Sequence, residues 1–336
     1  MGAPTAKNIY DQSIVIDGLN VSNWDSPAVI DSLQASGVAA INATLVSWEN
    51  FLETMSTITA WHRRFAEHRE VLAPVTGVDD ILAAKKDGKV GVILGWQNAT
   101  PLENDLSRLE LFYDLGVRII QLTFHERNLL GNGCWERVDD GLSNFGLDAV
   151  REMNRLGILI DLSHCGDRTT LEAIEHSEGP VAFTHANARS FHEHRRNKTD
   201  EALKRLADRD GVVGATGFNP FLKAGLDSTL DDFVDAIDDL VQRVGIDHVG
   251  FGTDFTQDQP ESFWSYIGSQ QGTKFPSTFF DPSTLHPDAA MSPKGMETPD
   301  KLPQLAEALS LRSYKAEEIS KILGGNWLRL LRQVWG

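Results

Sequence analysis

The chain has 336 residues, of which 41% are hydrophobic and 24% charged, and its formal net charge at pH 7 is −17. This composition is typical of a globular protein, and the length suits two average domains or one large α/β barrel. The negative charge repels phosphates and anionic lipid headgroups, so we expect no nucleic-acid partner and no membrane partner. Because the chain has only two cysteines, we expect no disulfide framework. We also expect no secretory signal and no membrane span, since the first residues form no apolar stretch and no long apolar window occurs. A cytoplasmic protein is therefore expected.

Short apolar segments alternate with amphipathic segments along the chain. The sequence predicts strands at 13–18, 38–45, 90–96, 117–124, 158–164, 181–185, 212–218 and 248–254. It predicts helices near 26–36, 47–69, 104–115, 141–156, 167–177, 199–209 and 229–244. Eight buried strands, each followed by a crossover in about 250 residues, are the pattern of a TIM (β/α)8 barrel. A doubly wound open sheet is the alternative, but no G-x-G-x-x-G follows the first strand.

The C-terminal part of the chain has a different character. Residues 255–300 are aromatic, rich in proline and without clear periodicity, which predicts a long loop that acts as a lid over the barrel mouth. Residues 301–335 predict two further helices, the second over 316–335. Because no repeat or low-complexity tract is present, we expect residues 1–336 to form a single domain.

Two histidines end consecutive predicted strands, His164 in "ILIDLSH" and His185 in "VAFTH". In a TIM barrel the reacting groups lie at the C-terminal ends of the strands, and neighbouring strands are roughly 4.8 Å apart. Two imidazoles on one tetrahedral zinc ion have nitrogens about 3.3 Å apart. The pair therefore predicts a metal site or a general base, although each histidine could also cap its own strand.

Three further features at the strand ends could carry chemistry. Asp254 ends the eighth strand and could accept a proton from a catalytic water, or simply cap the next loop. Arg195 and Arg196 could hold a substrate carboxylate, or form a solvated surface pair. Cys165 follows His164 directly, but adjacent residues of a strand face opposite ways, which disfavours a nucleophile here.

A more specific indication comes from four longer stretches. They are "GLSNFGLDAVREMNRLGILIDLSHCGDRTTLEAI", "PVAFTHANARSFHEHRRN", "HVGFGTDF" and "ILGGNWLRLL". Together they resemble the membrane dipeptidase (renal dipeptidase) family, peptidases of the M19 type within the amidohydrolase superfamily, and the resemblance covers essentially the whole chain. It implies a TIM barrel with a two-zinc site that hydrolyses dipeptides, often as a homodimer.

The resemblance also implies roles for four residues of this chain. His164 and His185 match the histidines that hold one of the two zinc ions. Arg196 matches the arginine that binds the C-terminal carboxylate of the substrate, and Asp254 matches the aspartate that takes part in proton transfer with the hydrolytic water.

Other positions depart from the family pattern. The first strand of the family ends in Asp-Gly-His-Asn-Asp, whose histidine and second aspartate bind the other zinc. In this chain the two ligand positions hold Leu19 and Val21, while Asn20 between them is retained. Leucine and valine side chains carry no donor atom, so neither can bind a metal ion.

Two more departures follow later strands. The metal-bridging glutamate of the family aligns with Gln97, and the active-site histidine after the fourth strand aligns with Phe124, although His125 and Glu126 are adjacent and could substitute. A neutral amide cannot bridge two zinc ions as a carboxylate does, so the two-metal site cannot form as in the family. We expect Gln97 and Phe124, with Asn20 and Arg196, to contact the substrate.

These observations predict a dipeptidase-like metallohydrolase that cleaves a dipeptide or a small carboxylate-bearing amide. It would use at most one divalent metal ion, zinc or another, on His164 and His185, with Asp254 as the base. A metal-free lyase or isomerase that uses the same three residues as acid and base groups is the first alternative. A non-catalytic protein that binds a small molecule is the second alternative. The family resemblance is what implies a homodimer.

Overall fold

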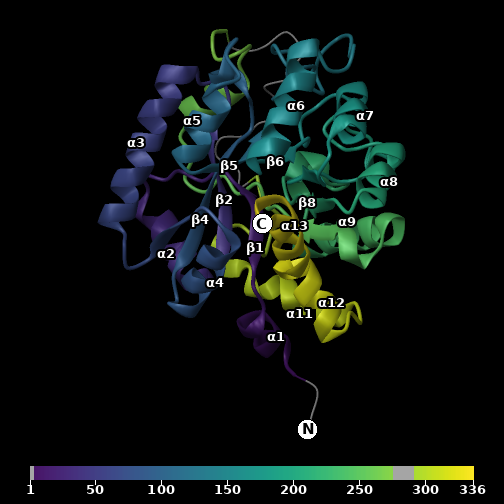
Figure 1. Cartoon of the computed structure of the whole chain (residues 1–336). Helices are drawn as coiled ribbons and strands as arrows, with labels where there is room; N and C mark the ends of the chain where they lie inside the picture. The colour runs from purple at the N-terminus through teal and green to yellow at the C-terminus, as the bar shows by residue number, and fades with distance from the viewer. Residues whose placement is uncertain (1–3, 275–290) are drawn as a thin grey trace.

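Parallel strands with buried side chains on both faces form the centre of the molecule, as their continuous apolar runs predict. The computed structural model describes residues 4–274 and 291–336, and these strands form a nearly closed barrel surrounded by helices (Figure 1). The strands are β1 (Ile16–Asn20), β2 (Ala40–Val46), β3 (Leu72–Val75), β4 (Val90–Trp96), β5 (Val117–Gln121), β6 (Leu159–Asp161), β7 (Ala182–Phe183), β8 (Val212–Ala215) and β9 (Val249–Phe251). Their order is β1-β2-β4-β5-β6-β7-β8-β9, and β3 pairs with β4 beside this path. The predicted TIM barrel is confirmed.

Helices connect most of the strands and cover the outside of the barrel (Figure 1). They are α1 (Ala6–Gln12), α2 (Pro27–Ser36), α3 (Phe51–Glu67), α4 (Val78–Lys86), α5 (Arg108–Asp114), α6 (Asn144–Leu156), α7 (Asp167–His176), α8 (Asp200–Asp208), α9 (Leu230–Val244), α10 (Glu261–Ile267), α11 (Pro303–Leu311), α12 (Ala316–Ser320) and α13 (Asn326–Trp335). Each longer helix buries one apolar stripe; in α9, Phe233, Ile237 and Leu240 are buried while Asp235 is exposed.

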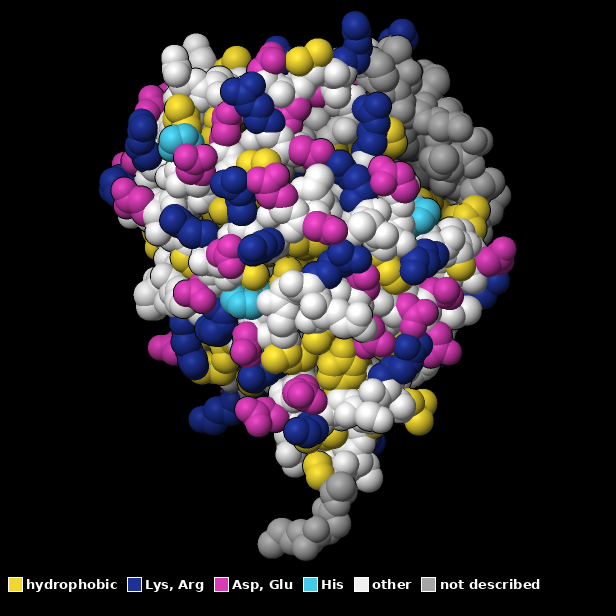
Figure 2. All heavy atoms as spheres, turned by 90° about the vertical axis from the view of Figure 1, so that its right-hand side faces the viewer, with side chains coloured by type: hydrophobic (Ala, Val, Ile, Leu, Met, Phe, Trp, Pro, Cys, Tyr) yellow, Lys and Arg dark blue, Asp and Glu magenta, His cyan; other side chains and the backbone are white. Residues whose placement is uncertain are grey.

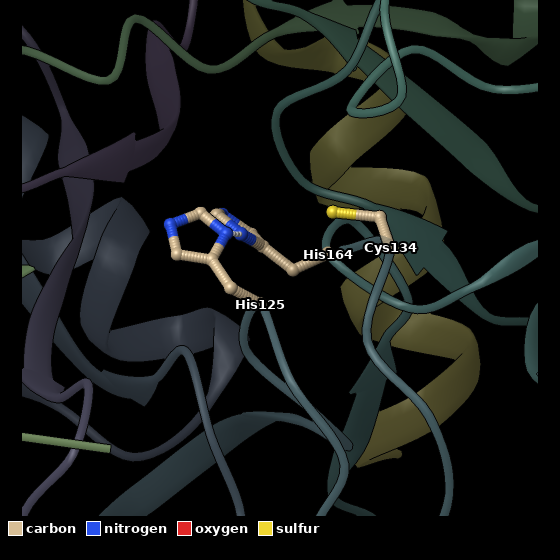
Figure 3. Close-up of side chains that lie close together, drawn as sticks. All are labelled: His125, Cys134 and His164. Atoms are coloured by element: carbon tan, nitrogen blue, oxygen red, sulfur yellow. Dashed lines mark hydrogen bonds between the residues drawn. The ribbon is translucent and has the colours of Figure 1, made fainter. Parts of the chain in front are cut away.

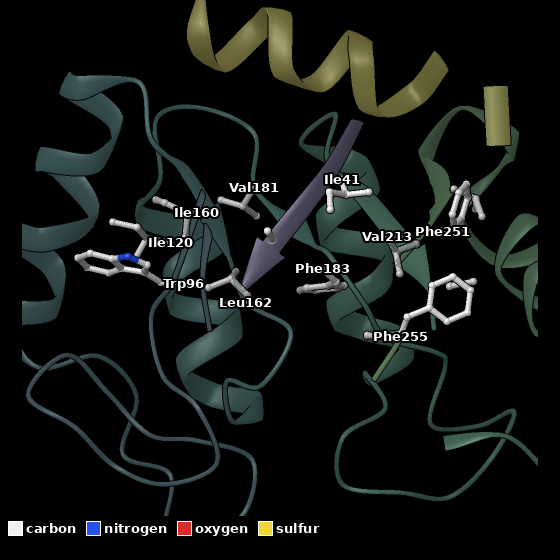
Figure 4. Packing of buried hydrophobic residues seen from close by; sticks show 14 of the residues in the cluster. Ile41, Trp96, Ile120, Ile160, Leu162, Val181, Phe183, Val213, Phe251 and Phe255 are labelled. Atoms are coloured by element: carbon white, nitrogen blue, oxygen red, sulfur yellow. The ribbon is translucent and has the colours of Figure 1, made fainter. Parts of the chain in front are cut away.

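The buried side chains of successive strands meet in the core, where Ile41, Trp96, Ile120, Ile160 and Phe183 belong to one cluster (Figure 4). Four elements, β3, α1, α4 and α10, are absent from the predicted pattern. β3 is only four residues long and contains a proline, which weakens the signal of a strand.

Several predicted strands extend too far toward their C-terminal ends. β6 ends at Asp161 and β9 ends at Phe251, three residues before the predicted ends at 164 and 254. The chain leaves the sheet at these points and turns across the barrel mouth. His164, His185 and Asp254 therefore lie in the loops that directly follow β6, β7 and β9, rather than on the strands.

The first and last strands are joined by a buried carboxylate. Asp17 on β1 accepts hydrogen bonds from the backbone N–H of Thr253 (2.8 Å) and from its hydroxyl (2.7 Å). A parallel bridge between Asn20 and Phe255 continues this seam. Gly18 is needed here, because a Cβ atom would lie 2.7 Å from Cζ2 of Trp327. The Asp-Gly of the first strand thus closes the barrel.

The C-terminal helices lie beside α1 at one end of the molecule, away from the mouth (Figure 1). Trp327 and Leu330 of α13 pack among residues at the beginnings of the strands, such as Ile16 and Val212. The predicted second helix over 316–335 is wrong in detail, because α12 and α13 are separated by a π-helical turn in which the backbone of Gly324 is not helical.

The predicted lid over 255–300 lies only partly within the described residues, since 275–290 are outside them. Its first part contains α10. None of the helices in the described part of the chain combines the length and the apolar character that crossing a bilayer requires. Basic and acidic side chains are interspersed over the face that Figure 2 shows, so no block of one sign dominates this side.

Candidate active site

A cavity of about 390 Å³ lies at the C-terminal ends of the barrel strands. Its walls are mainly aromatic and aliphatic, and Phe263 and Trp264 of α10 contribute to them. Its polar residues include Gln97, His125, His164 and Asp254. An apolar pocket with a few converging polar groups at the mouth of a TIM barrel is the expected place for an active site.

Three histidines form a continuous cluster at this mouth. Nε2 of His164 lies 2.9 Å from Nε2 of His185, and Nδ1 of His164 lies 3.2 Å from Nδ1 of His125. Burial lowers the pKa of all three imidazoles well below 6.5, and the nearby Arg196 lowers them further. The cluster is therefore neutral near pH 7, the state in which imidazole binds metal ions or accepts protons.

A chain of hydrogen bonds fixes the position of His185 within the cluster. Asp161 accepts a hydrogen bond from the Thr184 hydroxyl (2.6 Å), whose oxygen lies 2.7 Å from Nδ1 of His185. The backbone N–H of His185 donates to the hydroxyl of Ser163, which in turn donates to Asp161. His185 itself is fully buried and does not line the cavity.

One cysteine joins the cluster. His125, Cys134 and His164 each offer one potential ligand atom, and these atoms all lie within 4.8 Å of one another. Figure 3 shows the sulfur of Cys134 pointing toward the two imidazoles. The sequence indicated His125 as a substitute for the residue at position 124, but it gave no reason to place Cys134 here. A cysteine after "GNG", nine residues beyond His125, was the available signal.

Arg196 lies beneath the mouth and is 1% exposed. Its guanidinium donates to the backbone carbonyl oxygens of Ser163 (2.5 Å) and His185 (2.6 Å), and its Nε has no partner among the described residues. It does not line the cavity. Arg195, in contrast, is exposed, and its guanidinium lies 5.9 Å from the ring centre of Trp135.

Asp254 lines the same cavity as His125 and His164. Burial raises the pKa of Asp254 to about 6, and the positive charge of Arg196 acts in the opposite direction. A carboxylate with this pKa is largely ionised at neutral pH and can exchange a proton there.

The remaining predicted site residues divide into two groups. Val21, Gln97 and Phe124 line the cavity, and Phe124 stacks on His164 with ring centres 4.4 Å apart. Leu19 and Asn20 do not line it: Leu19 is buried, and the side chain of Asn20 contacts the Asp17 side chain and the Ser22 backbone.

These positions decide which metal arrangement fits. At the mouth, Val21 offers no donor atom, and Gln97 offers a neutral amide that donates to the Thr44 hydroxyl. Neither position therefore supplies a carboxylate for a second ion. The histidines fit one ion, because the 3.2 Å between the Nδ1 atoms of His125 and His164 matches the roughly 3.3 Å expected for two nitrogens on one zinc.

Cys165 is not part of the cluster. It is 1% exposed, and the hydroxyl of Thr123 donates to its sulfur at 3.3 Å. Burial raises the pKa of its thiol to about 11, so it remains protonated at neutral pH, as expected for a structural cysteine.

Comparisons with known proteins identify the family of this chain. A curated dipeptidase of Schizosaccharomyces pombe, described as uncharacterized, is 31% identical over 289 residues, which is 84% of this chain. A dipeptidase of Claviceps purpurea is 30% identical over 260 residues, or 76% of this chain. The chain spans 62% and 54% of the lengths of these two relatives.

A solved structure is similar to this chain over the whole fold. An amidohydrolase from Pseudomonas aeruginosa is 39% identical and superposes with a TM-score of 0.94, covering 99% of this chain and 100% of its own. The family model described as membrane dipeptidase (Peptidase family M19) matches residues 25–264, which include β2 to β9 and the histidine cluster. The chain belongs to the membrane dipeptidase family, peptidase family M19.

Proposed function

We propose that this protein is a hydrolase that cleaves a dipeptide or a small carboxylate-bearing amide with one divalent metal ion at the histidine cluster that contains His164 and His185. The observation that carries the proposal is the common cavity, which brings His125, His164 and Asp254 to one mouth. Membership of a peptidase family supports the reaction class. The loss of the second ligand set supports the restriction to one ion.

Different residues of the chain have different roles in the proposed amide hydrolysis. The histidine cluster would hold a divalent ion, and that ion would supply Lewis-acid polarisation of the scissile carbonyl. Asp254, ionised at neutral pH, accepts the proton of the attacking water and returns it to the leaving amine. Phe124 holds the ring plane of His164 by stacking. The apolar walls exclude bulk water, which strengthens each of these electrostatic interactions.

Arg196 provides the positive charge for the carboxylate of the substrate. Two carbonyl oxygens fix its guanidinium, and the buried Nε lacks a partner among the residues described. A buried donor without an acceptor carries a free-energy penalty of about 1–3 kcal/mol. Because Arg196 does not line the cavity, a substrate carboxylate reaches this nitrogen only when the side chain moves toward the mouth. The contact would then remove the penalty and favour ligands that carry a carboxylate.

A dipeptide panel tests the proposal. The purified protein is assayed as isolated, after treatment with a strong chelator, and after zinc, cobalt or manganese is restored. We expect hydrolysis that the chelator abolishes and the metal restores. His185→Ala should lose activity, whereas His176→Ala, which removes an exposed histidine on α7, should keep it.

The alternatives predict different results in the same experiment. Activity that survives the chelator but is lost in His185→Ala indicates a metal-free acid–base enzyme. Binding of carboxylate ligands without turnover indicates a non-catalytic binding protein. Protein that contains no metal and hydrolyses no dipeptide in the presence of any of these metals contradicts the proposed function.

A further inference from the structure

We propose that His125, Cys134 and His164 are the ligands of the metal ion and that His185 is not a ligand but orients His164 from behind. This inference rests on the proposed function only in that both place one ion at the mouth. It assigns to the site a thiolate ligand and a different pair of imidazoles from the pair that the family resemblance implies.

The distances favour the pair of His125 and His164. Two nitrogens and a sulfur on a tetrahedral zinc ion lie about 3.3–3.6 Å apart, given the usual Zn–N and Zn–S bond lengths. The two Nδ1 atoms are 3.2 Å apart, and Cys134 completes a set within 4.8 Å. A side-chain movement of about 1 Å is enough to close the set around an ion.

The hydrogen-bond chain fixes which nitrogen of His164 is free. The Thr184 hydroxyl donates to Asp161, so its oxygen accepts from the Nδ1–H of His185. Nε2 of His185 then carries a lone pair and accepts from the Nε2–H of His164, 2.9 Å away. Nδ1 of His164 is left with its lone pair directed toward His125. An outer partner that fixes the tautomer of a metal-binding histidine is the usual arrangement.

The loop that carries Cys134 is held against both histidines. The backbone N–H of Cys134 donates to the carbonyl of His164 (2.7 Å), and that of Trp135 donates to the carbonyl of His125 (2.9 Å). Gly133 permits this close approach, because a Cβ atom there would lie 2.2 Å from the carbonyl carbon of His125. The backbone of the loop that carries Cys134 is therefore fixed beside both histidines before any ion arrives.

Charge also favours an anionic ligand. Arg196 and Lys198 are buried close enough to the cluster to influence His164 and His185. Both side chains repel a cation, and neutral imidazoles do not offset them. Asp254 and Asp161 offset part of this positive charge, and a thiolate at Cys134 would add a negative charge in direct contact with the ion. His125 and His164 line the cavity, so three protein ligands leave the side toward the substrate open, as in catalytic zinc sites.

Cobalt titration of the metal-free protein under reducing conditions tests the assignment. A thiolate ligand gives Co²⁺ a sulfur-to-metal charge-transfer band in the near ultraviolet, and binding releases about one proton from Cys134. The parent should show both signals. Cys134→Ser should lose the band and the proton release, whereas Cys165→Ser, the matched control at the buried cysteine, should keep them.

His185 provides the second comparison. His185→Gln should keep the charge-transfer band and weaken zinc binding by roughly 10- to 100-fold, the usual effect of removing an outer partner. X-ray absorption of the zinc-loaded parent requires no variant and should show one sulfur neighbour at about 2.3 Å.

The outcomes separate this inference from the proposed function. A zinc environment without sulfur, or full metal affinity in Cys134→Ser together with its loss in His185→Gln, overturns the assignment and leaves the proposed hydrolase intact. A sulfur-containing site in a protein that hydrolyses no dipeptide supports the assignment and contradicts the proposed function.

Discussion

The ionisation of Asp254 should control the rate at mildly acidic pH. Burial raises the pKa of this carboxyl from 3.8 to about 6. The carboxylate is then roughly nine-tenths ionised at pH 7 and roughly one-tenth ionised at pH 5. If Asp254 is the base, kcat/KM should fall about tenfold between these two values, with an apparent pKa near 6. The three histidines protonate at lower pH, because burial has lowered their pKa values.

Asp254→Asn removes the charge of the carboxylate and keeps the size of the side chain. The backbone of Asp254 has a φ of 57°, a left-handed conformation that asparagine also tolerates, so the variant should keep the loop. We expect kcat/KM at pH 7 to fall by roughly 10²- to 10⁴-fold, the usual contribution of a general base. The fall in rate between pH 7 and pH 5 should disappear as well.

The same substitution has an opposite effect on stability. A pKa that is raised on folding gives a contribution that is fully present below the unfolded pKa of 3.8 and is lost as the pH rises through about 6. At about 1.4 kcal/mol for each pKa unit, burial of the charged form costs up to about 3 kcal/mol at pH 8. Urea denaturation should therefore find Asp254→Asn more stable than the parent at pH 8, with no such gain at pH 4.

Asp258→Asn is the matched control for both measurements. Asp258 also has a left-handed backbone, with a φ of 58°, but it is exposed. Its substitution should leave the pH profile and the stability difference unchanged. An acid limb near pH 6 that persists in Asp254→Asn would refute the assignment of the base to this residue.

Three further substitutions probe the binding site and the barrel. Arg196→Lys should weaken binding of a carboxylate-bearing amide by roughly 10- to 100-fold in calorimetry, because a charged hydrogen bond contributes about 1.5–3 kcal/mol. Equal affinity in the variant and the parent would show that Arg196 does not bind the substrate. Gly18→Ala should lower the free energy of unfolding by roughly 1–3 kcal/mol, because the new methyl group meets Trp327. An unchanged urea midpoint would show that the barrel relaxes around the methyl group. Thr253→Val removes a hydrogen-bond donor to Asp17, and burial raises the pKa of Asp17 to about 7. The variant should therefore lose more stability in urea at pH 9 than at pH 5, where the carboxyl of Asp17 is protonated. A loss of stability that does not depend on pH would contradict this.

The barrel could be predicted because its signal is local. Each of the eight strands on the barrel path contains a short apolar run, and the helices between them show the spacing of an amphipathic surface. β3 gives no such signal, because its four residues include Pro74 and two positions that are not buried. The break at Gly324 was missed, although two successive glycines mark it in the sequence; a Cβ atom at Gly324 would lie 2.1 Å from the carbonyl oxygen of Ile14, so this close approach requires glycine.

The site was predictable only in part, and the reason is physical. His164 and Asp254 follow strands, so their place at the mouth is a consequence of the fold. The partners of Arg196 are backbone carbonyl groups, which have no sequence signal. Cys134 reaches the cluster through a loop whose hydrogen bonds to the histidine backbones form only in the folded chain.

The substitutions at the mouth are linked through charge. Compared with the family pattern, Val21 and Gln97 replace two carboxylates, while the buried cations Arg196 and Lys198 remain. A mouth that loses two negative charges and keeps two positive ones holds a cation poorly unless another anion is near. Asp254 is one such anion, and Cys134 can provide a second as a thiolate. If Cys134 is a ligand as proposed, the exchange of carboxylates for a single sulfur should reduce the number of ions that the mouth binds. It should also favour a metal that binds thiolate, such as zinc, over one that prefers oxygen ligands.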